Sequence, residues 1–381
     1  MTETRLFAPE SEARDFLDTF RHYENPSAVA PLKGDAAHEV AVGPVHAGVI
    51  EPGHFRFQCM GEDVYNLQIF LGYQYRGVEE KIVEADGNVA RQLALAETCA
   101  GDTSIAAATC ISEILESRSG KGPDGDALAV RTVLLELERI ANHVGDLGAL
   151  AGDVAFLPTA SFCGRIRGDY LNMTALVCGN RFGRGAVVPG GARVSLDAAK
   201  REELAKRIAA AKKDLDGALK LMFEEPTVLE RLQGTGVVPR EVAEKIGLVG
   251  VARRASVELK GDVLSRAQVR RMEIEEAHAR ISEVLSDSFP QGDAASLPRH
   301  DPQGDAASSR VTVVVSTTAA WRGPLVHAAM FGTDGKMSAY RIVDPSARNW
   351  PGLAWALRGE QISNFPICNK SFNLSYCGTD R

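Results

Sequence analysis

The sequence predicts a mainly α-helical protein of the α+β class, with a central helical bundle and small β-rich segments near both ends. Residues 38–70 contain short apolar and β-branched runs broken by Gly and Pro, which predict an antiparallel β element. A β-branched run at 310–317 and a hairpin pattern around Asp334 and Gly335 predict strands near the C-terminus. Between them, four long stretches carry apolar residues at helical spacing: 89–116, 128–150, 195–225 and 261–285.

Each predicted helix depends on residue spacing, and one also on a cap. Residues 89–116 are rich in Ala, Leu and Ile, and residues 128–150 repeat apolar side chains every three or four positions. Residues 195–225 open with Ser-Leu-Asp, which can cap a helix N-terminus. Residues 261–285 form a fourth long helical pattern.

Composition restricts the class of protein. With 381 residues, 45% of them hydrophobic, the chain can bury a sizeable core. The formal charge of -7 argues against a nucleic-acid binder, because neutralising phosphates needs a surplus of Lys and Arg. No apolar run suits a signal peptide or reaches the ~18 residues of a membrane span, so we expect a cytoplasmic chain. Seven widely spaced cysteines predict reduced, mostly buried thiols.

The domain organisation is predicted from local composition. Residues 1–37 mix charge, Pro and Ala around one short helical pattern and predict a peripheral N-terminal extension, followed by one domain over 38–381. Within that domain the hexapeptide QGDAAS occurs at 291–296 and again at 303–308. Its Gly, Asp, Ser and neighbouring Pro predict a flexible loop at about 288–310, to which we assign no chemistry.

Seven segments spread over residues 43–381 together resemble one protein family. It comprises the large subunits of group 4 nickel–iron hydrogenases, of the formate hydrogenlyase type, and the D-type, 49 kDa quinone-site subunit of complex I. Their order and joint presence carry the resemblance, which implies a hydrogenase large-subunit-like fold around a central helical bundle. The segments are GPVHAGVIEPGHFRF (43–57), LGYQYRGVEEK (71–81), AETCAGDTS (96–104), LELERIANHVGDLGAL (135–150), VVPGG (187–191), GDVLSRAQVRRMEI (261–274) and DPSARNWPGLAWALRGEQISNFPICNKSFNLSYCGTDR (344–381).

A hydrogenase of this family holds nickel and iron with two Cys-x-x-Cys pairs, because thiolates at this spacing can bind one metal together. By the resemblance, the first pair falls at Cys99 and Asp102, and the second at Ser375 and Gly378. Only Cys99 remains a thiol, while Cys377 lies one residue from an expected position. We therefore expect vestigial ligand positions with buried thiols and no nickel–iron centre.

A rearranged metal site is the alternative to a vestigial pocket. It would use Cys99, Cys377 and Asp102, with His46 as a further ligand, since carboxylate and imidazole bind divalent metals. The sequence also ends at Arg381, without the C-terminal extension that hydrogenase maturation removes, which favours a chain that receives no nickel.

In the complex I branch of the family, the vacated cavity binds a quinone headgroup. The resemblance implies that the loop at 43–54 lines this cavity, with His46, His54, Tyr73 and Tyr75 as candidate donors to the quinone carbonyls. The alternative is that both tyrosines only pack at a helix entry. Tyr75 stands where the family carries His, so a proton relay through this position would be slowed.

Two further residues are catalytic candidates by the same resemblance. Glu79 is the acid of the family's Arg-Gly-x-Glu motif and is the best candidate for a proton-carrying carboxylate, although Arg76 could instead hold it in a structural ion pair. Arg322 lies in a segment that in hydrogenases suspends an arginine over the ligands of iron. Without iron, Arg322 could meet a quinone oxygen or an acidic side chain.

A helical stripe of charged residues has two interpretations. We favour the interpretation that these side chains pair with one another inside the protein. The alternative is that they couple redox change to a membrane arm. The members of the stripe recur at mostly three- and four-residue spacing: Glu138, Arg139, His143 and Asp146.

The resemblance implies the large subunit of a membrane-associated, complex I-like or energy-converting-hydrogenase-related oxidoreductase complex. Such a subunit would couple electron transfer from a neighbouring iron–sulfur subunit to a quinone-type acceptor and to ion translocation. Expected partners are a B-type small subunit like that of complex I, carrying a 4Fe-4S cluster, a C-type complex I chain, and membrane-arm subunits on the inner face of the cell membrane. We do not expect activity from the chain alone, and partner subunits would set the electron donor, whether NADH, ferredoxin, formate or a carbon monoxide dehydrogenase. An active hydrogenase with unusual ligands and a non-catalytic scaffold are the alternatives.

Overall fold

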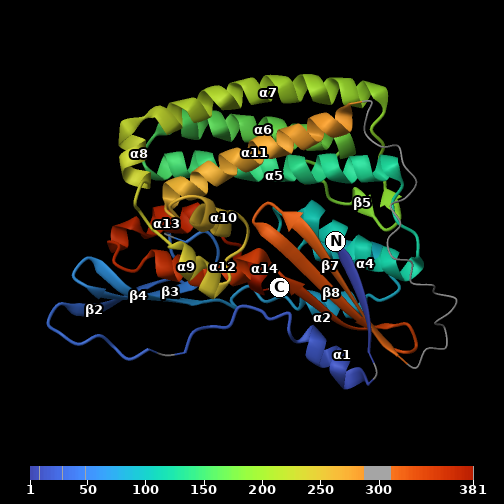
Figure 1. Ribbon diagram of the computed structural model, residues 1–381, viewed down its shortest axis with the longest axis horizontal. Helices are drawn as coiled ribbons and strands as arrows, with labels where there is room; N and C mark the ends of the chain where they lie inside the picture. The colour runs from blue at the N-terminus through green and yellow to red at the C-terminus, as the bar shows by residue number, and fades with distance from the viewer. Residues whose placement is uncertain (8, 28, 48, 287–309, 381) are drawn as a thin grey trace.

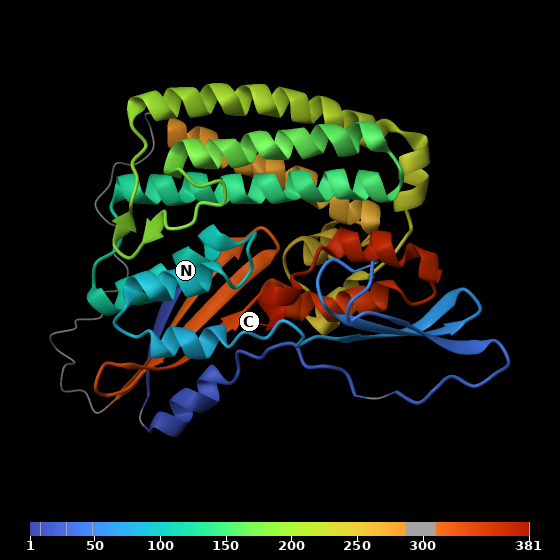
Figure 2. The ribbon, with the colours of Figure 1, turned by 180° about the vertical axis from the view of Figure 1, so that it is seen from behind.

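The computed structural model describes residues 1–380 apart from 8, 28, 48 and 287–309. Four long helices run alongside one another as a bundle, with α6 (Leu157–Cys178) and α11 (Val263–Leu285) on opposite sides of it, and small sheets with shorter helices lie beneath them (Figures 1 and 2). The prediction of a mainly α, α+β fold is confirmed. The other two long helices are α5 (Gly125–Asp153) and α7 (Ala198–Glu224).

Three of these helices begin after an aspartate cap. Asp124, Asp197 and Asp262 each accept a hydrogen bond from the backbone N–H three residues further on, which satisfies one donor of the first helical turn. Helix α5 packs against α6 and α11, so it buries apolar residues around most of its circumference. The helices predicted at 128–150, 195–225 and 261–285 are therefore confirmed, with small shifts at their ends.

The stretch predicted as helical at 89–116 forms two helices instead of one. Helix α3 (Val89–Glu97) and helix α4 (Ser104–Ser119) are separated by a turn at residues 98–103. Gly101 and Asp102 lie in this turn, and both residue types are poorly suited to a helix interior. The break places Asp102 at a chain reversal, where its side chain can face other segments.

The larger sheet joins the two ends of the chain. It has the order β1-β7-β8-β9, all antiparallel, and its β8–β9 hairpin confirms the turn predicted at Asp334 and Gly335. Strand β1 pairs along β7, from Thr2 opposite Ser316 to Phe7 opposite Val311. The strands are β1 (Thr2–Phe7), β7 (Val311–Ala320), β8 (Gly323–Phe331) and β9 (Met337–Val343).

The N-terminal segment is more than a peripheral arm. Helix α1 (Glu10–Leu17) buries Ala13 and Leu17 against the apolar face of β7 and β8. Because residues 2–17 supply both a strand and core side chains, the expectation of a surface arm is wrong for this part. The domain boundary at residue 37 stays a prediction.

The second sheet carries the loop that was predicted to line the site. Strands β2 (Ala37–Val42), β3 (His54–Met60) and β4 (Asp63–Phe70) form an antiparallel sheet, as predicted for 38–70. The β2–β3 loop starts at Gly43, which has φ +97° and whose added Cβ would lie 1.9 Å from the carbonyl oxygen of Gly53. Only glycine fits this close approach of the two ends of the loop.

C-terminal helices pack beside this sheet and complete the lower layer. Trp350 is fully buried against the rings of Phe55 and Tyr376. These helices are α12 (Pro345–Ala356), α13 (Phe365–Phe372) and α14 (Tyr376–Asp380), with the 3-10 turn η1 (Ile362–Asn364) before α13. The remaining elements are α2 (Val78–Glu84), β5 (Val187–Val188), β6 (Gly191–Ala192), α8 (Pro226–Leu232), α9 (Arg240–Ile246) and α10 (Gly250–Glu258).

Two predictions concern membrane-spanning helices and the segment at about 288–310. Among the described helices, none combines the length and apolar character needed to cross a membrane. The flexible loop predicted at about 288–310, with its QGDAAS repeat, falls outside the described residues as far as 309.

Candidate functional site

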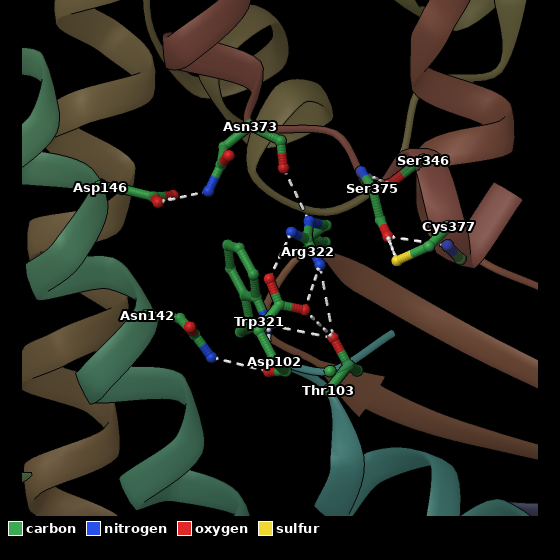
Figure 3. Close-up of polar contacts among 12 residues, drawn as sticks. Asp102, Thr103, Asn142, Asp146, Trp321, Arg322, Ser346, Asn373, Ser375 and Cys377 are labelled. Atoms are coloured by element: carbon green, nitrogen blue, oxygen red, sulfur yellow. Dashed lines mark hydrogen bonds and ion pairs between the residues drawn. The ribbon is translucent and has the colours of Figure 1, made fainter. Parts of the chain in front are cut away.

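Three segments that are distant in sequence meet at the candidate pocket. They are the turn at 98–103 between α3 and α4, the turn at 321–322 between β7 and β8, and the chain from Asn373 to Gly378 (Figure 3). The long helix α5 closes the pocket through Asn142 and Asp146. The residues that the resemblance pairs as metal positions, 99 with 102 and 375 with 378, therefore belong to segments that the fold brings together.

The centre of the pocket is an ion pair between Asp102 and Arg322. The Nη1 atom of Arg322 donates to Oδ1 of Asp102 at 2.8 Å, and Nη2 donates to Oδ2 at 2.7 Å. The guanidinium lies 3.9 Å from the ring centroid of Trp321, whose indole N–H donates to the backbone oxygen of Asp102. Burial alone would raise the pKa of Asp102, but the charge and hydrogen bonds of Arg322 outweigh it and lower this pKa. Asp102 is thus held as a carboxylate.

Arg322 also connects the pocket to the helical bundle. Its Nε atom donates to the backbone oxygen of Asn373 at 2.7 Å. The Asn373 amide donates to Asp146 on α5 at 2.5 Å, and Asp146 accepts from Nε of Arg270 on α11 at 2.7 Å. Asn373 has φ +45°, a left-handed conformation that Asn tolerates better than most residues. A polar network therefore joins the pocket to the long helices.

The C-terminal pair of predicted metal positions is occupied by internal hydrogen bonds. The hydroxyl of Ser375 accepts from the backbone N–H of Gly378 at 2.9 Å and lies 3.6 Å from the sulfur of Cys377. A Cβ added to Gly378 would lie 2.7 Å from Oδ2 of Asp344 and 2.8 Å from the Ser375 hydroxyl. The space where a ligand cysteine would begin is therefore filled.

Burial disfavours the thiolate form of the two nearby cysteines in the metal-free chain. Burial raises the pKa of Cys99 far above its usual range, and burial together with the charge of Glu51 raises the pKa of Cys377 to about 11. Within the described residues, no group of three or more His, Cys, Asp or Glu side chains is placed to hold a metal ion. The donors present do not fit a nickel–iron centre, which needs four thiolates.

Two loops that carry the quinone candidates are fastened to helix α14. Glu51, in the β2–β3 loop, accepts from the backbone N–H of Cys377 at 3.0 Å. Asp380 accepts from the backbone N–H groups of Gly72 and Gln74 at 2.8 and 2.9 Å. The structure thus places the loops at 43–53 and 72–77 on the same short helix, beside the pocket.

The candidate donors in these loops differ in exposure. His46 is exposed, whereas His54 is half-buried, with Nδ1 3.3 Å from the carbonyl oxygen of Gly43. Tyr73 is 50% and Tyr75 62% exposed, and the alternative that both tyrosines only pack at a helix entry stays a prediction. The Tyr75 hydroxyl donates to Glu80 at 2.7 Å, which raises the pKa of Tyr75.

The cavity beside Asp102 is too small to hold a quinone ring. The described cavity beside Asp102 has a volume of about 20 Å³, close to the space that one water molecule needs. It is also bordered by Glu138, whose pKa is raised by burial to about 8, and by Arg167 and Arg181. This described cavity is therefore too small for a quinone headgroup.

Glu79 is buried behind the pocket. It is 8% exposed, and its Oε1 accepts from the backbone N–H of Ile342 at 2.7 Å. Burial raises its pKa to about 7, partly opposed by the Ile342 hydrogen bond and by Arg341, whose Nη1 lies 3.7 Å away. His22 lies 3.5 Å from Oε2 of Glu79. A carboxyl group with this pKa can exist in both protonation states near neutral pH.

In the described structure, Arg76 does not form the structural ion pair with Glu79 that was considered in the sequence analysis. Its guanidinium donates to the backbone oxygens of Thr98, Cys99 and Cys377. It therefore fastens the turn after α3 to α14, while Arg341 and His22 are the cationic side chains that lie within 4 Å of Glu79 in the described structure.

The charged stripe on α5 is largely paired internally, as the favoured interpretation expects, but Nδ1 of His143 is buried without a hydrogen-bond partner among the described residues. Glu138 accepts from the backbone N–H of Ile105 at 2.8 Å, at the first turn of α4. His143 Nε2 lies 2.8 Å from Glu273 of α11, and Arg139 pairs with Glu136 at 2.9 Å. A coupling role for this stripe stays a prediction.

Sequence reasoning missed several residues that build the site. These residues lie in or beside the segments that carry the resemblance, but none occupies a metal-ligand or quinone-donor position there. No motif signalled them, because their roles depend on tertiary contacts, three of which span more than 200 residues. They are Glu51, Asp344, Asn373 and Asp380.

Comparison with known proteins agrees with the architecture. The family described as respiratory-chain NADH dehydrogenase, 49 Kd subunit, matches residues 153–258, which run from the end of α5 to α10. Hydrogenase-4 component G of Escherichia coli (strain K12) is 27% identical over 355 residues, covering 91% of this chain and 62% of that protein. NADH-quinone oxidoreductase subunit 4 of Thermus thermophilus is 26% identical over 379 residues, covering 84% of this chain and 88% of that protein. The chain thus spans less than two thirds of the hydrogenase-4 component.

A solved structure shows the same fold over nearly the whole chain. A chain of the membrane-bound sulfane sulfur reductase, an archaeal respiratory membrane complex, superimposes with a TM-score of 0.76 at 20% sequence identity. The match covers 91% of this chain and 99% of that chain. The homologues thus belong to multi-subunit membrane complexes. Residues 153–258 thus resemble the complex I 49 kDa-type family, and the relatives of the whole chain are hydrogenase large subunits and D-type subunits of complex I.

Proposed function

We propose that this chain is the large subunit of a membrane-associated, complex I-like oxidoreductase complex whose nickel–iron ligands have mostly been lost. It would couple electron transfer from a neighbouring iron–sulfur subunit to a quinone-type acceptor and to ion translocation. The Asp102–Arg322 ion pair carries this proposal. A carboxylate engaged by a bidentate guanidinium is a weak ligand for a soft metal, and it satisfies an arginine that would otherwise be buried alone.

The loops beside the pocket support a quinone-type acceptor. They present His46, His54 and Tyr73 next to α14, and Glu79 lies behind them as a carboxyl group that can hold a proton near neutral pH. A quinone, when bound, would supply a two-electron, two-proton acceptor. The chain's own residues would orient its headgroup and supply protons.

Exposed apolar side chains on the same loops support a tight partner. Val45 is 87% and Ile50 56% exposed, beside the exposed Tyr73 and Tyr75. Exposed apolar side chains on two loops that are both fastened to α14 are typical of a protein interface. The expected occupant is a B-type complex I chain with a 4Fe-4S cluster, with a C-type complex I chain and membrane-arm subunits completing the assembly. Association through these partners would place the chain at the cell membrane.

Two alternatives predict different behaviour of the purified complex. An active hydrogenase with unusual ligands, built on Cys99, Cys377 and Asp102, would oxidise hydrogen. A scaffold with an empty pocket would neither oxidise hydrogen nor reduce any quinone. The engagement of Asp102 by Arg322 and the filled space at Gly378 disfavour the first alternative.

The experiment measures electron transfer from reduced methyl viologen to decylubiquinone by the complex purified through this chain. We expect quinone reduction without hydrogen oxidation, and a fall of about tenfold or more in the His54→Ala variant. His38→Ala is the matched control, because His38 is an exposed histidine on the neighbouring strand β2. Hydrogen-dependent viologen reduction would support a hydrogenase, and failure to reduce or bind the quinone would support a scaffold.

A further inference from the structure

The segment between α1 and β2 crosses the edge of both sheets. We name residues 18–27 the strap; in Figures 1 and 2 it is part of the blue coil that leaves α1 and runs below the body of the protein. Tyr23 donates its hydroxyl to the carbonyl oxygen of Ile69 at 2.8 Å. Asn25 exchanges two hydrogen bonds with the backbone of Leu71, at 2.8 and 3.1 Å. The strap is therefore fixed along the end of β4, beside the loop at 72–77.

The strap covers the buried carboxyl group of Glu79. Nε2 of His22 lies 3.5 Å from Oε2 of Glu79, and the His22 side chain keeps 28% of its surface exposed. On the other side, Asp18 of the strap pairs with Arg341 at 3.3 Å, and Arg341 faces Glu79 from β9. Among the described residues, the strap thus contacts the two cationic groups within 4 Å of Glu79: it supplies His22 and pairs with Arg341.

The charged surroundings of Glu79 leave His22 as the group best suited to exchange protons with it. Arg341 stays protonated at any physiological pH, so it cannot deliver a proton. Glu80, the neighbour on α2, carries the same charge type as Glu79 and is engaged by the Tyr75 hydroxyl. An imidazole can exchange protons with a carboxyl group, and the half-buried side chain of His22 places Nε2 beside Oε2 of Glu79 while part of its surface stays exposed to solvent.

The hydrogen bonding of His22 leaves its ring adjustable. Nδ1 is buried and has no hydrogen-bond partner in the described structure, so no second contact fixes the imidazole in one position. The separation of 3.5 Å at Nε2 is longer than a normal hydrogen bond. A small approach of the ring would shorten it to transfer distance.

We propose that His22 is the proton-transfer partner of Glu79, linking this carboxyl group to solvent. The imidazolium breaks its Nε2–H bond and keeps the electron pair, and the proton forms an O–H bond at Oε2 of Glu79. The products are a neutral imidazole and a neutral carboxylic acid, and water or buffer protonates the imidazole again. This inference rests on the proposed function, in which Glu79 supplies protons to the site. His22 lies outside the segments that carry the family resemblance.

The first test measures viologen-to-decylubiquinone electron transfer by the purified complex. His22→Ala should lower the rate about tenfold or more at neutral pH, and millimolar imidazole should restore most of it with a pH profile that follows the added buffer. His38→Ala should neither lose activity nor respond to imidazole. A slow His22→Ala complex that imidazole does not rescue would show a structural role only, and would overturn the inference.

A second measurement needs no turnover and separates the two proposals. The infrared C=O band of protonated Glu79, identified as the band missing in Glu79→Gln, shifts when the proton exchanges for deuterium. Mildly acidic D₂O should exchange this band at least about tenfold more slowly in His22→Ala than in the native complex, with rescue by imidazole. Equal exchange rates would overturn the role of His22. If Glu79→Gln keeps full quinone reductase activity, the role of Glu79 in the proposed function fails instead, whatever the exchange rates are.

Discussion

Asp102 and Arg322 join two turns that are more than 200 residues apart in sequence, through parallel hydrogen bonds of 2.8 and 2.7 Å. The pair lies where the family resemblance places a metal ligand and an arginine above iron. The two hydrogen bonds connect the turn between α3 and α4 to the turn between β7 and β8. A metal ion bound by both turns would connect them in the same way. Arg322 is buried, so the carboxylate of Asp102 also compensates its charge.

Removing the carboxylate should therefore be costly for stability. In Asp102→Asn the guanidinium of Arg322 keeps its charge but loses its counterion, and we expect the free energy of unfolding to fall by about 2–3 kcal/mol. Breaking a fully buried pair costs about 3–5 kcal/mol, and the 35% exposure of the Asp102 side chain reduces this through solvent screening. Urea unfolding of the purified chain measures the change.

An exposed ion pair provides the control. Asp169 pairs with Arg165 on the surface of α6 at 2.9 Å, and Asp169→Asn should change stability by less than about 0.5 kcal/mol. Equal effects of the two substitutions would contradict a structural role for the Asp102–Arg322 pair. The double variant Asp102→Asn with Arg322→Met should recover part of the loss, because it removes the unpaired charge.

Restoring bulk at Gly378 should destabilise the C-terminal helix. In Gly378→Ala the new Cβ would lie 2.7 Å from Oδ2 of Asp344, and the expected cost is about 1–3 kcal/mol of unfolding free energy. Gly164→Ala is the control on α6, because its Cβ would meet nothing within 4 Å and should stabilise the helix by up to about 1 kcal/mol. A Gly378→Ala chain as stable as the native one would show that the position can still accept a ligand side chain.

Glu79 should give the stability a specific pH dependence. Because its pKa rises from 4.5 to about 7 on folding, the folded chain binds more protons than the unfolded chain between these values, and stability falls as pH rises through this window. Glu79→Gln should remove that slope and make the chain about 1–3 kcal/mol more stable above pH 7, with no gain below pH 4. Urea midpoints across this pH range check it. A native-like slope in the variant would contradict the burial of an ionisable Glu79.

The reactivity of the Cys377 thiol should depend on the charge of Glu51. Burial and the charge of Glu51, whose Oε1 lies 3.8 Å from the sulfur, raise the pKa of Cys377 to about 11. Glu51→Gln should lower this pKa and speed alkylation of Cys377 by iodoacetamide about threefold or more, since the thiolate is the reactive form. Mass spectrometry measures the rate, with buried Cys59 as the internal control. An unchanged rate at Cys377 would mean that Glu51 does not control this thiol.

The parts of the fold that follow a regular period could be predicted from sequence. The spacing of apolar residues located α5, α7 and α11, and the Asp334-Gly335 turn located the β8–β9 hairpin. Helix α6 was not predicted, because it packs on both α5 and α7 and its apolar residues do not form one clear stripe. Strand β1 was missed because its partner is β7, some 300 residues later, and local patterns do not report such pairing.

The sequence identified individual residues of the candidate site but not the contacts between them. The resemblance identified Asp102 and Arg322 separately, and it left open whether Arg322 would meet an acidic side chain. The ion pair between them emerges only when the turns at 98–103 and 321–322 are brought together by the fold. His22 could not be identified at all from sequence, because it lies in an irregular segment and its partner Glu79 is reached through tertiary structure.

Metal content tests the central claim most directly. The complex purified through this chain should contain iron in multiples of about four, from a partner's iron–sulfur clusters, with no nickel and no hydrogen-dependent viologen reduction. That result would agree with a pocket in which the Asp102–Arg322 pair has replaced the metal. Nickel at about one atom per chain, together with hydrogen oxidation, would contradict the account and point to a rearranged centre that includes Cys99 and Cys377.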